Sequence, residues 1–465
     1  MTPVRTTRPP NTCRPAIPPQ LLVTMRAIAQ LKPDPRNPRL HTDKQIRRIA
    51  KSIQAFGFNV PVLVDRSGQL VAGHGRLAAV VHLGWEQVPA ICLEHLTPDQ
   101  AAAYQIADNR LTDISTWDEQ LLAEQLQYLS AAELDFDLEA IGFDLPEIDL
   151  HIQGLSDEED AEEAVDLPQP DAMPVSRVGD LWQLGPHRIL CGDALDPASY
   201  QRVMAGEVAR LIFTDPPYNV PIAGHVSGNG TIKHREFAMA CGEMDEAAFT
   251  QFLQQACELM KGVSLPGSLH YVCMDWRHLQ EVLAAGMAVY DEFKNLCVWV
   301  KDNAGMGSLY RSQHELVLVF KYGAAPHVNN VQLGQYGRHR SNVWKYAGVN
   351  SFARASDEGN LLAMHPTVKP LALVADVLMD ASNRGDVVLD PFLGSGTTLM
   401  AAEKTCRVAR GLELDPLYID TAIRRWQKRT GQSARLTGDG RTFDEIEAQL
   451  RSTLTAAAAT SQVLS

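Results

Sequence analysis

The sequence lacks paired cysteines, long apolar runs and an excess of basic charge. Its eight cysteines are scattered over 465 residues without a Cys-x-x-Cys pair, which argues against a zinc site and against a secreted disulfide framework. Reduced thiols in a cytoplasm are the simpler interpretation. No apolar run approaches the ~20 residues that a membrane-spanning helix needs, and the proline-broken start of the chain has no signal-peptide core. We therefore expect a cytoplasmic protein without a bound metal.

Acidic residues outnumber basic ones by 56 to 42, so the formal net charge is −14. DNA phosphates are contacted by clustered Lys and Arg, so this chain is not an indiscriminate coater of nucleic acid, although a local basic face could still bind it. The apolar share of 45% and the charged share of 21% are ordinary for a soluble globular protein. At roughly 100–200 residues per domain, the length suggests about two to four domains.

An acidic segment divides the chain. The run from Asp157 to Glu163 is followed by Leu167-Pro168-Gln169-Pro170, a composition typical of a solvated linker. The start of the chain is rich in Pro, Thr and Arg, which indicates disorder. The predicted parts are a disordered leader at 1–25, an N-terminal domain at 26–150, an acidic linker at 151–177, a larger domain at 178–445 and a tail at 446–465.

Short apolar strands alternate with helical segments in the larger domain. The clearest strands are Leu211–Phe213, Val298–Val300, Leu316–Phe320 and Val387–Leu389. Such alternation predicts an α/β fold with a mainly parallel sheet and helices on both faces. Ligands of such sheets sit at the carboxyl ends of the strands.

The N-terminal domain is expected to be smaller and of the α+β class. Thr42 and Gln45 fit a capping box, and apolar residues at helical spacing lead from there to Gly57, where a helix should stop. The runs Val60–Asp65 and Gln69–Ala72 predict two strands joined by a turn.

A glycine turn follows the strand that ends at Asp390. Within Asp390-Pro-Phe-Leu-Gly-Ser-Gly-Thr, Gly394 and Gly396 let the backbone approach a ligand closely. Glu413 follows Gly394 by 19 residues, close to the ~20 expected for an acid that holds ribose hydroxyls. Leu399 stands where a dinucleotide motif has its third glycine, and no Gly-Lys-Ser/Thr marks a phosphate-binding loop. The pattern favours a ligand with a nucleoside but no pyrophosphate.

A second motif, Asp215-Pro-Pro-Tyr218, comes directly after the strand that ends at Thr214. The exocyclic amine of a nucleobase is a poor nucleophile because its lone pair is delocalised into the ring. A carboxylate, and a carbonyl held by a following proline, could accept its two hydrogens and draw the nitrogen towards tetrahedral geometry. An aromatic ring beside them could stack on a base flipped out of a duplex.

Five segments together resemble the beta group of amino DNA methyltransferases, in which the catalytic motif precedes the cofactor motif. Besides the two motifs above, they are Leu190-Cys-Gly-Asp193, His365-Pro-Thr-Val-Lys-Pro370 and Gly411-Leu-Glu-Leu-Asp415, the last followed by Tyr418. The resemblance covers about Val178 to Asp439. It implies a Rossmann-like methyltransferase sheet with circularly permuted motifs and S-adenosylmethionine as the methyl donor.

The resemblance also implies a role for each matching residue. Asp215 would accept the target amine, the Pro216 carbonyl, held by Pro217, would be the second acceptor, and Tyr218 would stack on the base. The expected cofactor-binding residues are Asp193, His365, Lys369, Asp390, Phe392, Gly394, Ser395, Gly396, Thr397 and Glu413. For His365, capping of the following helix is an equally good explanation.

The region from 294 to 350 is locally basic and carries interleaved aromatic side chains. That mix suits phosphate contacts and insertion into the gap left by a flipped base. The candidate DNA-contacting residues are Lys301, Arg311, Arg338, Arg340 and Lys345. Asn303–Gly307 would be a mobile loop over the base. A solvated basic face is the alternative for any one of these residues.

Residues 26–115 resemble the ParB and sulfiredoxin-like domain through Val71-Ala-Gly-His-Gly-Arg76. The turn formed by Gly73, His74, Gly75 and Arg76 can face a nucleotide phosphate or the DNA backbone in such domains. Sulfiredoxin chemistry needs a cysteine at this turn, and none stands there, so that activity is rejected. A regulatory, DNA-tethering or vestigial role is left open.

These observations predict a site-specific methyltransferase that acts on N6 of adenine in double-stranded DNA. N4-cytosine methylation uses the same acceptors, often with Ser in place of Asp, so Asp215 favours adenine. Cytosine C5 methylation is excluded because it requires a cysteine nucleophile, usually after proline, and no Pro-Cys occurs. A non-catalytic ParB-like DNA-binding or partition protein is the alternative of another class. The sequence leaves open a homodimer, a nuclease partner and the recognition site.

Overall fold

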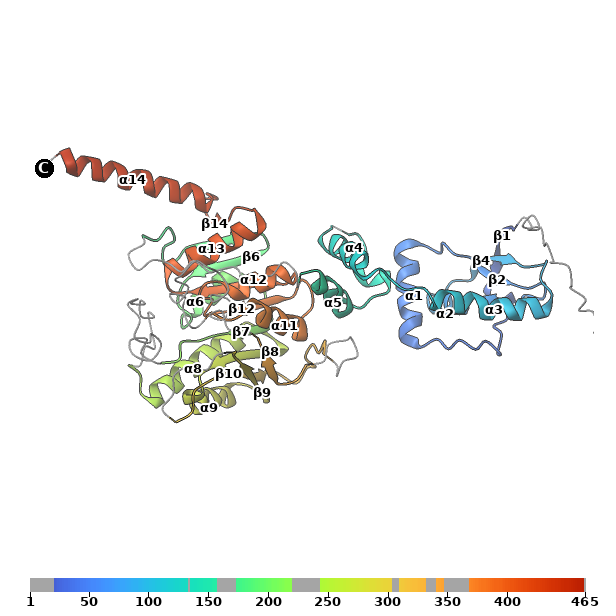
Figure 1. Ribbon diagram of the computed structural model, residues 1–465, viewed down its shortest axis with the longest axis horizontal. Coiled ribbons are helices and arrows are strands. Elements are labelled where there is room, and N and C mark those ends of the chain that lie inside the picture. The colour runs from blue at the N-terminus through green and yellow to red at the C-terminus, as the bar shows by residue number, and fades with distance from the viewer. Residues whose placement is uncertain are drawn as a thin grey trace, which may run out of the picture. The chain divides into compact units, whose positions relative to one another are not determined.

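The structure is a computed structural model that describes residues 21–132, 134–156, 173–219, 243–302, 309–331, 340–346 and 368–463. The chain divides into two compact units, Met1–Leu155 and Ser156–Ser465 (Figure 1). Among the helices of the described ranges, none is both long enough and apolar enough to cross a membrane.

The first unit contains a four-stranded sheet in the order β1-β4-β2-β3. Its strands are β1 Val23–Ala27, β2 Val62–Val64, β3 Leu70–Ala72 and β4 Gln87–Cys92. The two strands expected on either side of a turn, β2 and β3, pair antiparallel. Together with the helices below, the sheet confirms a smaller α+β domain.

Helix α1, Asp43–Phe56, begins where the capping box predicts. Thr42 Oγ1 accepts a hydrogen bond from the Gln45 amide at 3.2 Å. Gly57 ends the helix with a φ of 83°, a conformation that glycine adopts at no steric cost. Ala50 and Ile53 are buried in the core of this unit. The other elements are η1 Ile28–Gln30, α2 His74–His82, α3 Pro98–Asp113, α4 Glu119–Ala131, η2 Leu138–Ile141 and α5 Leu145–Ser156.

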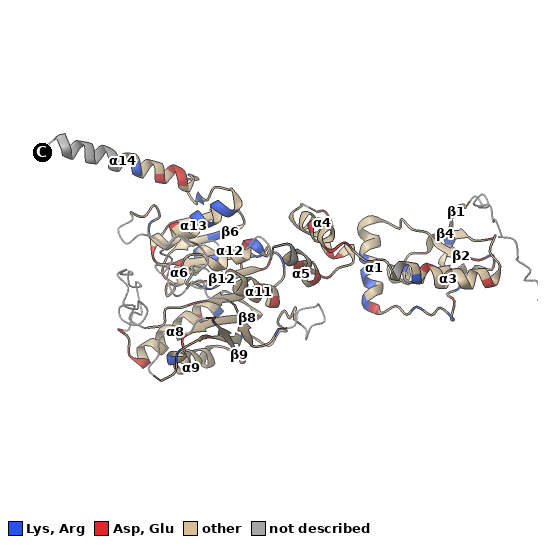
Figure 2. Ribbon diagram, in the orientation of Figure 1, with Lys and Arg blue, Asp and Glu red and all other residues tan. Residues whose placement is uncertain are grey.

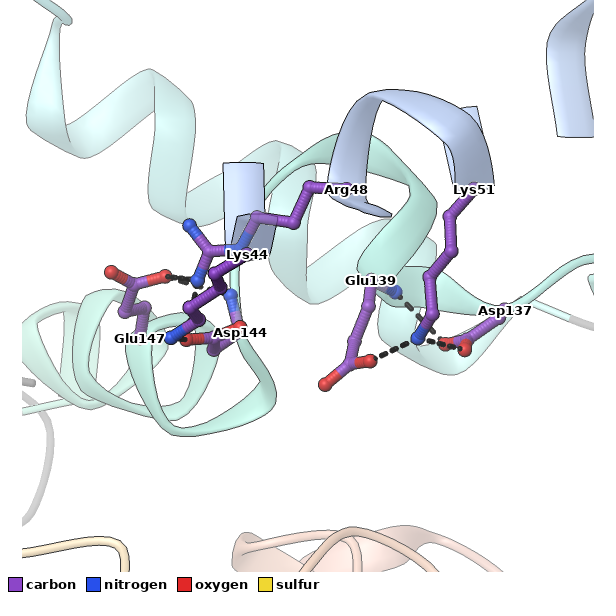
Figure 3. Close-up of polar contacts among 7 residues, drawn as sticks. All are labelled: Lys44, Arg48, Lys51, Asp137, Glu139, Asp144 and Glu147. Carbon is purple, nitrogen blue, oxygen red and sulfur yellow. Dashed lines mark hydrogen bonds and ion pairs between the residues drawn. The ribbon is translucent and has the colours of Figure 1, made fainter. Parts of the chain in front are cut away.

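Basic residues gather along α1 (Figure 2), and several of them point at acidic residues around η2 and the start of α5 (Figure 3). We call these contacts the α1 ion-pair cluster. Its pairs are Lys44–Asp144, Arg48–Asp144, Arg48–Glu147, Lys51–Asp137 and Lys51–Glu139. The cluster ties α1 to a segment 86 to 100 residues further along the chain, and it neutralises much of the positive charge of the helix.

Three expected boundaries differ from the structure. Strand β1 begins at Val23, inside the expected leader, and α5 continues to Ser156, inside the expected linker. At the other end of that linker, the amides of Val175 and Ser176 donate to the Asp420 carboxylate at 2.7 and 2.9 Å. The expected boundaries lie where the composition changes. The structure shows that the hydrogen-bonded chain extends beyond those points.

The second unit is built on a ten-stranded sheet in the order β11-β9-β10-β8-β7-β12-β13-β6-β5-β14. The strands β8, β7, β12, β13 and β6 at its centre run parallel, and this confirms the predicted α/β class. The sheet as a whole is mixed, because β10, β5 and β14 pair antiparallel with their neighbours. Their bounds are β5 Leu181–Leu184, β6 His187–Cys191, β7 Ala209–Thr214, β8 Ser264–Met274, β9 Glu292–Val300, β10 His314–Lys321, β11 Val343–Lys345, β12 Val387–Asp390, β13 Val408–Glu413 and β14 Arg435–Leu436.

Helices cover both faces of this sheet. One buried cluster joins α6, α8 and α9 to Ile212 and Leu389, and a second joins α11, α12 and α13 to Leu211 and Val388. Successive strand residues point to opposite faces, so the central strands are buried on both sides and read as continuous apolar runs. The helices are α6 Pro197–Met204, α8 Glu246–Gly262, η3 Trp276–His278, α9 Leu279–Val289, α11 Leu371–Ala381, α12 Thr397–Lys404, α13 Pro416–Thr430 and α14 Phe443–Val463.

Helix α14 covers the region expected to be a tail after residue 445. Phe443 at its start is buried and makes an edge-to-face contact with Trp182. Ile446 and Leu450 pack against the same core. The first turns of α14 therefore belong to the fold of the second unit.

Candidate active site

Two neighbouring parallel strands bring the two sequence motifs together. β12 pairs with β7, with Val388 opposite Leu211 and Leu389 opposite Ile212. Asp390 at the end of β12 and Asp215 just after β7 therefore lie at the same edge of the sheet, as expected from the strand pattern. Thr214 Oγ1 links the two segments directly by donating to Asp390 Oδ1 at 3.1 Å.

Asp390 anchors the glycine turn through three hydrogen bonds. Besides Thr214, its carboxylate accepts from Thr398 Oγ1 at 2.6 Å and from the Phe392 amide at 3.1 Å. Burial raises the pKa of Asp390 to about 7, although these donors favour the charged form. Because all three donors belong to the protein, Asp390 positions the turn.

Glycine stands at the two positions of the turn for different physical reasons. Gly396, with φ of 87°, has no room for a side chain because a Cβ there would lie 2.7 Å from Ala422 Cβ on α13. Gly394, with φ of 54°, is different, since a Cβ there would meet nothing within 4 Å. Its backbone therefore borders open space, as the binding surface for a ligand must.

Glu413 lies beside this open space at the end of β13. Its carboxylate accepts from the Gly394 amide at 2.8 Å and from the Asp415 amide at 2.9 Å. Burial raises the pKa of Glu413 to about 7. An acid held next to an open glycine turn fits the sugar hydroxyls of a nucleoside.

The other expected cofactor residues surround the same turn, where the structure describes them. Asp193 follows β6, the strand next to β13, and its Oδ1 accepts from the Leu195 amide at 2.8 Å. The Phe392 ring lies 6.0 Å from that of Phe252. The Ser395 carbonyl accepts from Arg425 at 2.8 Å, and Thr397 begins α12. His365 lies outside the described residues.

The Asp215 carboxylate is held on both sides by protein donors. Tyr218 Oη donates to Oδ1 at 2.5 Å, and Lys369 Nζ donates to Oδ2 at 2.6 Å. Lys369 also lies 3.1 Å from Tyr218 Oη. The resemblance groups Lys369 with the cofactor-binding residues, and in the structure its ammonium contacts the catalytic motif. It reaches this position because Pro370 caps α11 directly before the helix packs on the sheet.

Sequence reasoning missed Glu315, which belongs to the same group of charges. Glu315 lies on β10, with Oε2 2.9 Å from Lys369 Nζ and 3.3 Å from Tyr218 Oη, while Oε1 pairs with Lys301. Burial opposes its ionisation, but the two lysines hold its pKa at about 2. An acid at the start of the apolar run Leu316–Phe320 was the one signal in the sequence, because buried carboxylates need a charged partner.

Asn219 closes the catalytic segment. Its φ is 52°, a left-handed conformation that asparagine tolerates. Asn219 Nδ2 donates to the Met244 carbonyl at 2.8 Å, and the Met244 amide donates back to Oδ1 at 3.3 Å. The Asn219 side chain thus ties the end of Asp215-Pro-Pro-Tyr218 to Met244, just before α8.

The candidate DNA-contacting residues divide into two groups. Lys301 pairs with Glu315, and Arg340 donates to Asp376 and Asp380 at 3.1 and 3.0 Å, so both cations are engaged inside the protein. These pairs argue against phosphate contacts by Lys301 and Arg340. Lys345 and Arg311 are exposed. Arg338 and Asn303–Gly307 lie outside the described residues.

In the first unit, the ParB-like turn joins β3 to α2. Gly73 has φ of 97°, and a Cβ on Gly75 would lie 3.0 Å from both His41 and Ile49. His74 Nε2 accepts from the Asp34 amide at 3.3 Å, while Arg76 donates to the Pro61 carbonyl at 3.4 Å. The turn is therefore packed by its own unit.

Family comparisons agree with this geometry. Residues 209–424, which include Asp215, Glu315, Asp390 and Glu413, match the DNA methylase family. The chain contains a DNA methylase domain. Two further matches lie in its N-terminal half, a ParB N-terminal domain at 20–110 and a ParB-methyltransferase HTH domain at 120–178. The ParB-like assignment of the N-terminal domain is thereby confirmed, and so is S-adenosylmethionine as the cofactor of this DNA methylase.

Individual relatives resemble different parts of this DNA methylase. Type II methyltransferase M.HpaI of Haemophilus parainfluenzae is 24% identical over 287 residues, which cover 57% of this chain and 78% of that protein. The ParB-like nuclease domain-containing protein YnaK of Escherichia coli K12 is 38% identical over 81 residues, covering 17% and 93%. Among solved structures, the M1.HpyAVI-SAM complex is 22% identical, with a TM-score of 0.35, covering 51% and 98%.

Proposed function

We propose that this DNA methylase transfers a methyl group to N6 of adenine. The observation that supports adenine is Asp215, which supplies an ionisable carboxylate where N4-cytosine enzymes often have a hydroxyl. The carboxylate and the Pro216 carbonyl accept the two hydrogens of the amine, so that its lone pair turns out of the ring. Tyr218 and the stiff Pro216-Pro217 pair hold this acceptor geometry.

S-adenosylmethionine supplies an electrophilic methyl group and fits the space beside Gly394. Glu413 would hold its ribose, and the backbone of Gly394, Ser395 and Gly396 would hold its sugar and methionine end. Phe392 and Asp193 would contribute to binding the nucleoside. Asp390 holds the turn in place by accepting hydrogen bonds from Thr214, Thr398 and the Phe392 amide.

The substrate of the proposed reaction is double-stranded DNA, from which the target base is flipped out of the helix. Exposed Lys345 and Arg311 supply phosphate contacts on the second unit. The ParB-like and HTH matches support a second DNA contact through the first unit. Similarity to a type II methyltransferase supports a role in DNA modification.

Mass spectrometry of nucleosides tests the base assignment. The protein is incubated with unmethylated plasmid and a methyl donor that carries a deuterated methyl group, and the DNA is digested to nucleosides. We expect labelled N6-methyladenine and no labelled N4-methylcytosine. Labelled N4-methylcytosine alone would contradict the adenine assignment while leaving the family assignment intact.

A further inference from the structure

Four charged side chains from four separate segments meet at the catalytic motif. Asp215 follows β7, Lys301 follows β9, Glu315 lies on β10 and Lys369 precedes α11. They form a chain of contacts from Asp215 to Lys369, on to Glu315 and then to Lys301. Two carboxylates and two ammonium groups give the cluster no net charge.

The two ends of this chain of contacts, Asp215 and Lys301, are more exposed than its middle. The side chain of Asp215 is 21% exposed, whereas those of Lys369 and Glu315 are 5% and 8% exposed. Asp215 is thus the acid that a base can reach, and Lys369 and Glu315 stand behind it. A buried charge is retained at such a place only when its partners compensate for lost hydration.

The arrangement raises a difficulty for amine binding. Both oxygens of Asp215 already accept hydrogen bonds, from Tyr218 and from Lys369. An ammonium bound to Asp215 alone would compete with the incoming amine and would make the carboxylate a poorer acceptor. Glu315 offers Lys369 a second carboxylate, at 2.9 Å against 2.6 Å for Asp215.

We propose that Glu315 is a positioning residue for methyl transfer, which draws the Lys369 ammonium away from Asp215 so that Asp215 can accept the target amine. The inference rests on the proposed role of Asp215 as the acceptor and is independent of which base carries the amine. Lys301 acts in the opposite direction, because it partly neutralises Glu315 and weakens its hold on Lys369.

The bonds formed and broken in methyl transfer show why the position of the Lys369 ammonium affects the reaction. The lone pair of the amine nitrogen forms the new bond to the methyl carbon, and the electron pair of the broken carbon–sulfur bond stays on sulfur. The nitrogen then loses one proton, which Asp215 accepts and passes to water. A lysine held close to Asp215 disfavours that protonation, whereas a lysine shared with Glu315 disfavours it less.

The sign of each charge predicts opposite effects on Asp215. The charged or titratable groups that act on its carboxylate are Lys369, Tyr218, Glu315, Asp390 and Cys273, with Lys301 acting through Glu315. Removing the negative charge of Glu315 lowers the pKa of Asp215. Removing the positive charge of Lys301 raises it.

The test compares E315Q and K301Q with the matched control E281Q. Glu281 lies on α9 with the same low exposure as Glu315 and pairs with His278, outside the site. Single-turnover methylation of unmethylated duplex DNA is measured against pH, so that product release does not mask the step. Cofactor binding and thermal melting of each variant show that it is folded.

For E315Q we expect a single-turnover rate lower by about tenfold to a hundredfold, with cofactor binding unchanged and the acid limb of the profile at lower pH. For K301Q we expect the acid limb at higher pH. A structural defect would not shift the acid limb of the pH–rate profile in opposite directions in the two variants. If E315Q matches E281Q in rate and in acid limb while D215A is inactive, this inference alone is wrong. If D215A remains active, the acceptor assignment and this inference both fall.

Discussion

At the residue scale, Asp215 and Asp390 are two carboxylates at the same sheet edge with different surroundings. Asp390 accepts three hydrogen bonds from its own fold, whereas Asp215 is paired with a lysine and is partly exposed. The first arrangement suits a structural anchor, and the second suits a group that exchanges partners during a reaction. The two carboxylates should therefore respond differently to substitution.

Replacing the acceptor is expected to stop turnover without emptying the cofactor site. D215A removes one aimed acceptor, a loss that commonly costs about 10² to 10³ in rate, while Gly394 and Glu413 are unaffected. Turnover on duplex DNA and calorimetric binding of S-adenosylmethionine measure the two effects. D439A, an exposed aspartate near the chain's last helix, is the control. Turnover near that of D439A would remove Asp215 from the mechanism.

Asp390 should make the stability of the cofactor-free protein depend on pH. Its pKa is about 7 in the folded protein and about 4 when unfolded. The folded state therefore binds more protons between these values, and stability is lost as the pH rises through 7. In D390N this contribution is absent, while Thr214 and Phe392 keep an oxygen acceptor. Melting temperatures from pH 5 to pH 8.5 should fall less in D390N; equal slopes would contradict the raised pKa.

At the element scale, the α1 ion-pair cluster changes which basic residues can meet DNA. Lys51 is held by Asp137 and Glu139, and Arg48 by Asp144 and Glu147. Arg47 on the same helix is exposed. The number of basic residues on this helix is therefore larger than the number that is available to contact DNA phosphates.

We expect R47Q to weaken DNA binding by the full-length chain more than K51Q does. One lost phosphate contact lowers the slope of log affinity against log salt by about 0.9, and Arg47 is the residue free of the cluster's carboxylates. Fluorescence anisotropy with duplex DNA at several salt concentrations gives both slopes. A larger change in K51Q than in R47Q would show that the cluster opens when DNA binds.

Contiguous motifs could be predicted from the sequence, and contacts between distant elements could not. Asp215-Pro-Pro-Tyr218 and the Asp390 turn each lie within a few residues after a recognisable strand, so their placement follows from the strand pattern. Lys369 meets Asp215 across 154 residues, and the pairing depends on the order of strands in the sheet. Arg340 looked available to DNA for the same reason, because its partners Asp376 and Asp380 lie on another element.

At the scale of the whole molecule, we propose that the second unit carries the chemistry and that the first unit adds DNA contacts. The cofactor and catalytic residues that the structure describes all lie in the unit Ser156–Ser465. Asp420 holds the start of that unit through the amides of Val175 and Ser176. These bonds show where the chain can be shortened.

A shortened chain that begins at Pro168 is expected to fold, bind cofactor and retain methylation, with weaker DNA binding and a shallower salt slope. A chain that begins at Gly179 is the matched comparison. It lacks the two amides and leaves Asp420 without these donors, so its melting temperature should be lower. Loss of cofactor binding in the Pro168 chain would show that the two units form one catalytic body. Unchanged affinity and salt slope would contradict DNA tethering by the first unit.

The reciprocal bonds between Asn219 and Met244 have a consequence for where the chain can be lengthened or shortened. The two residues are 25 positions apart, yet one amide side chain holds both strands of chain together beside Asp215. Insertions or deletions between them leave the geometry of the acceptor untouched, and each doubling of the enclosed length costs only about 0.6 kcal/mol of closure entropy. The number of residues between Asn219 and Met244 can therefore change while the reaction centre stays the same.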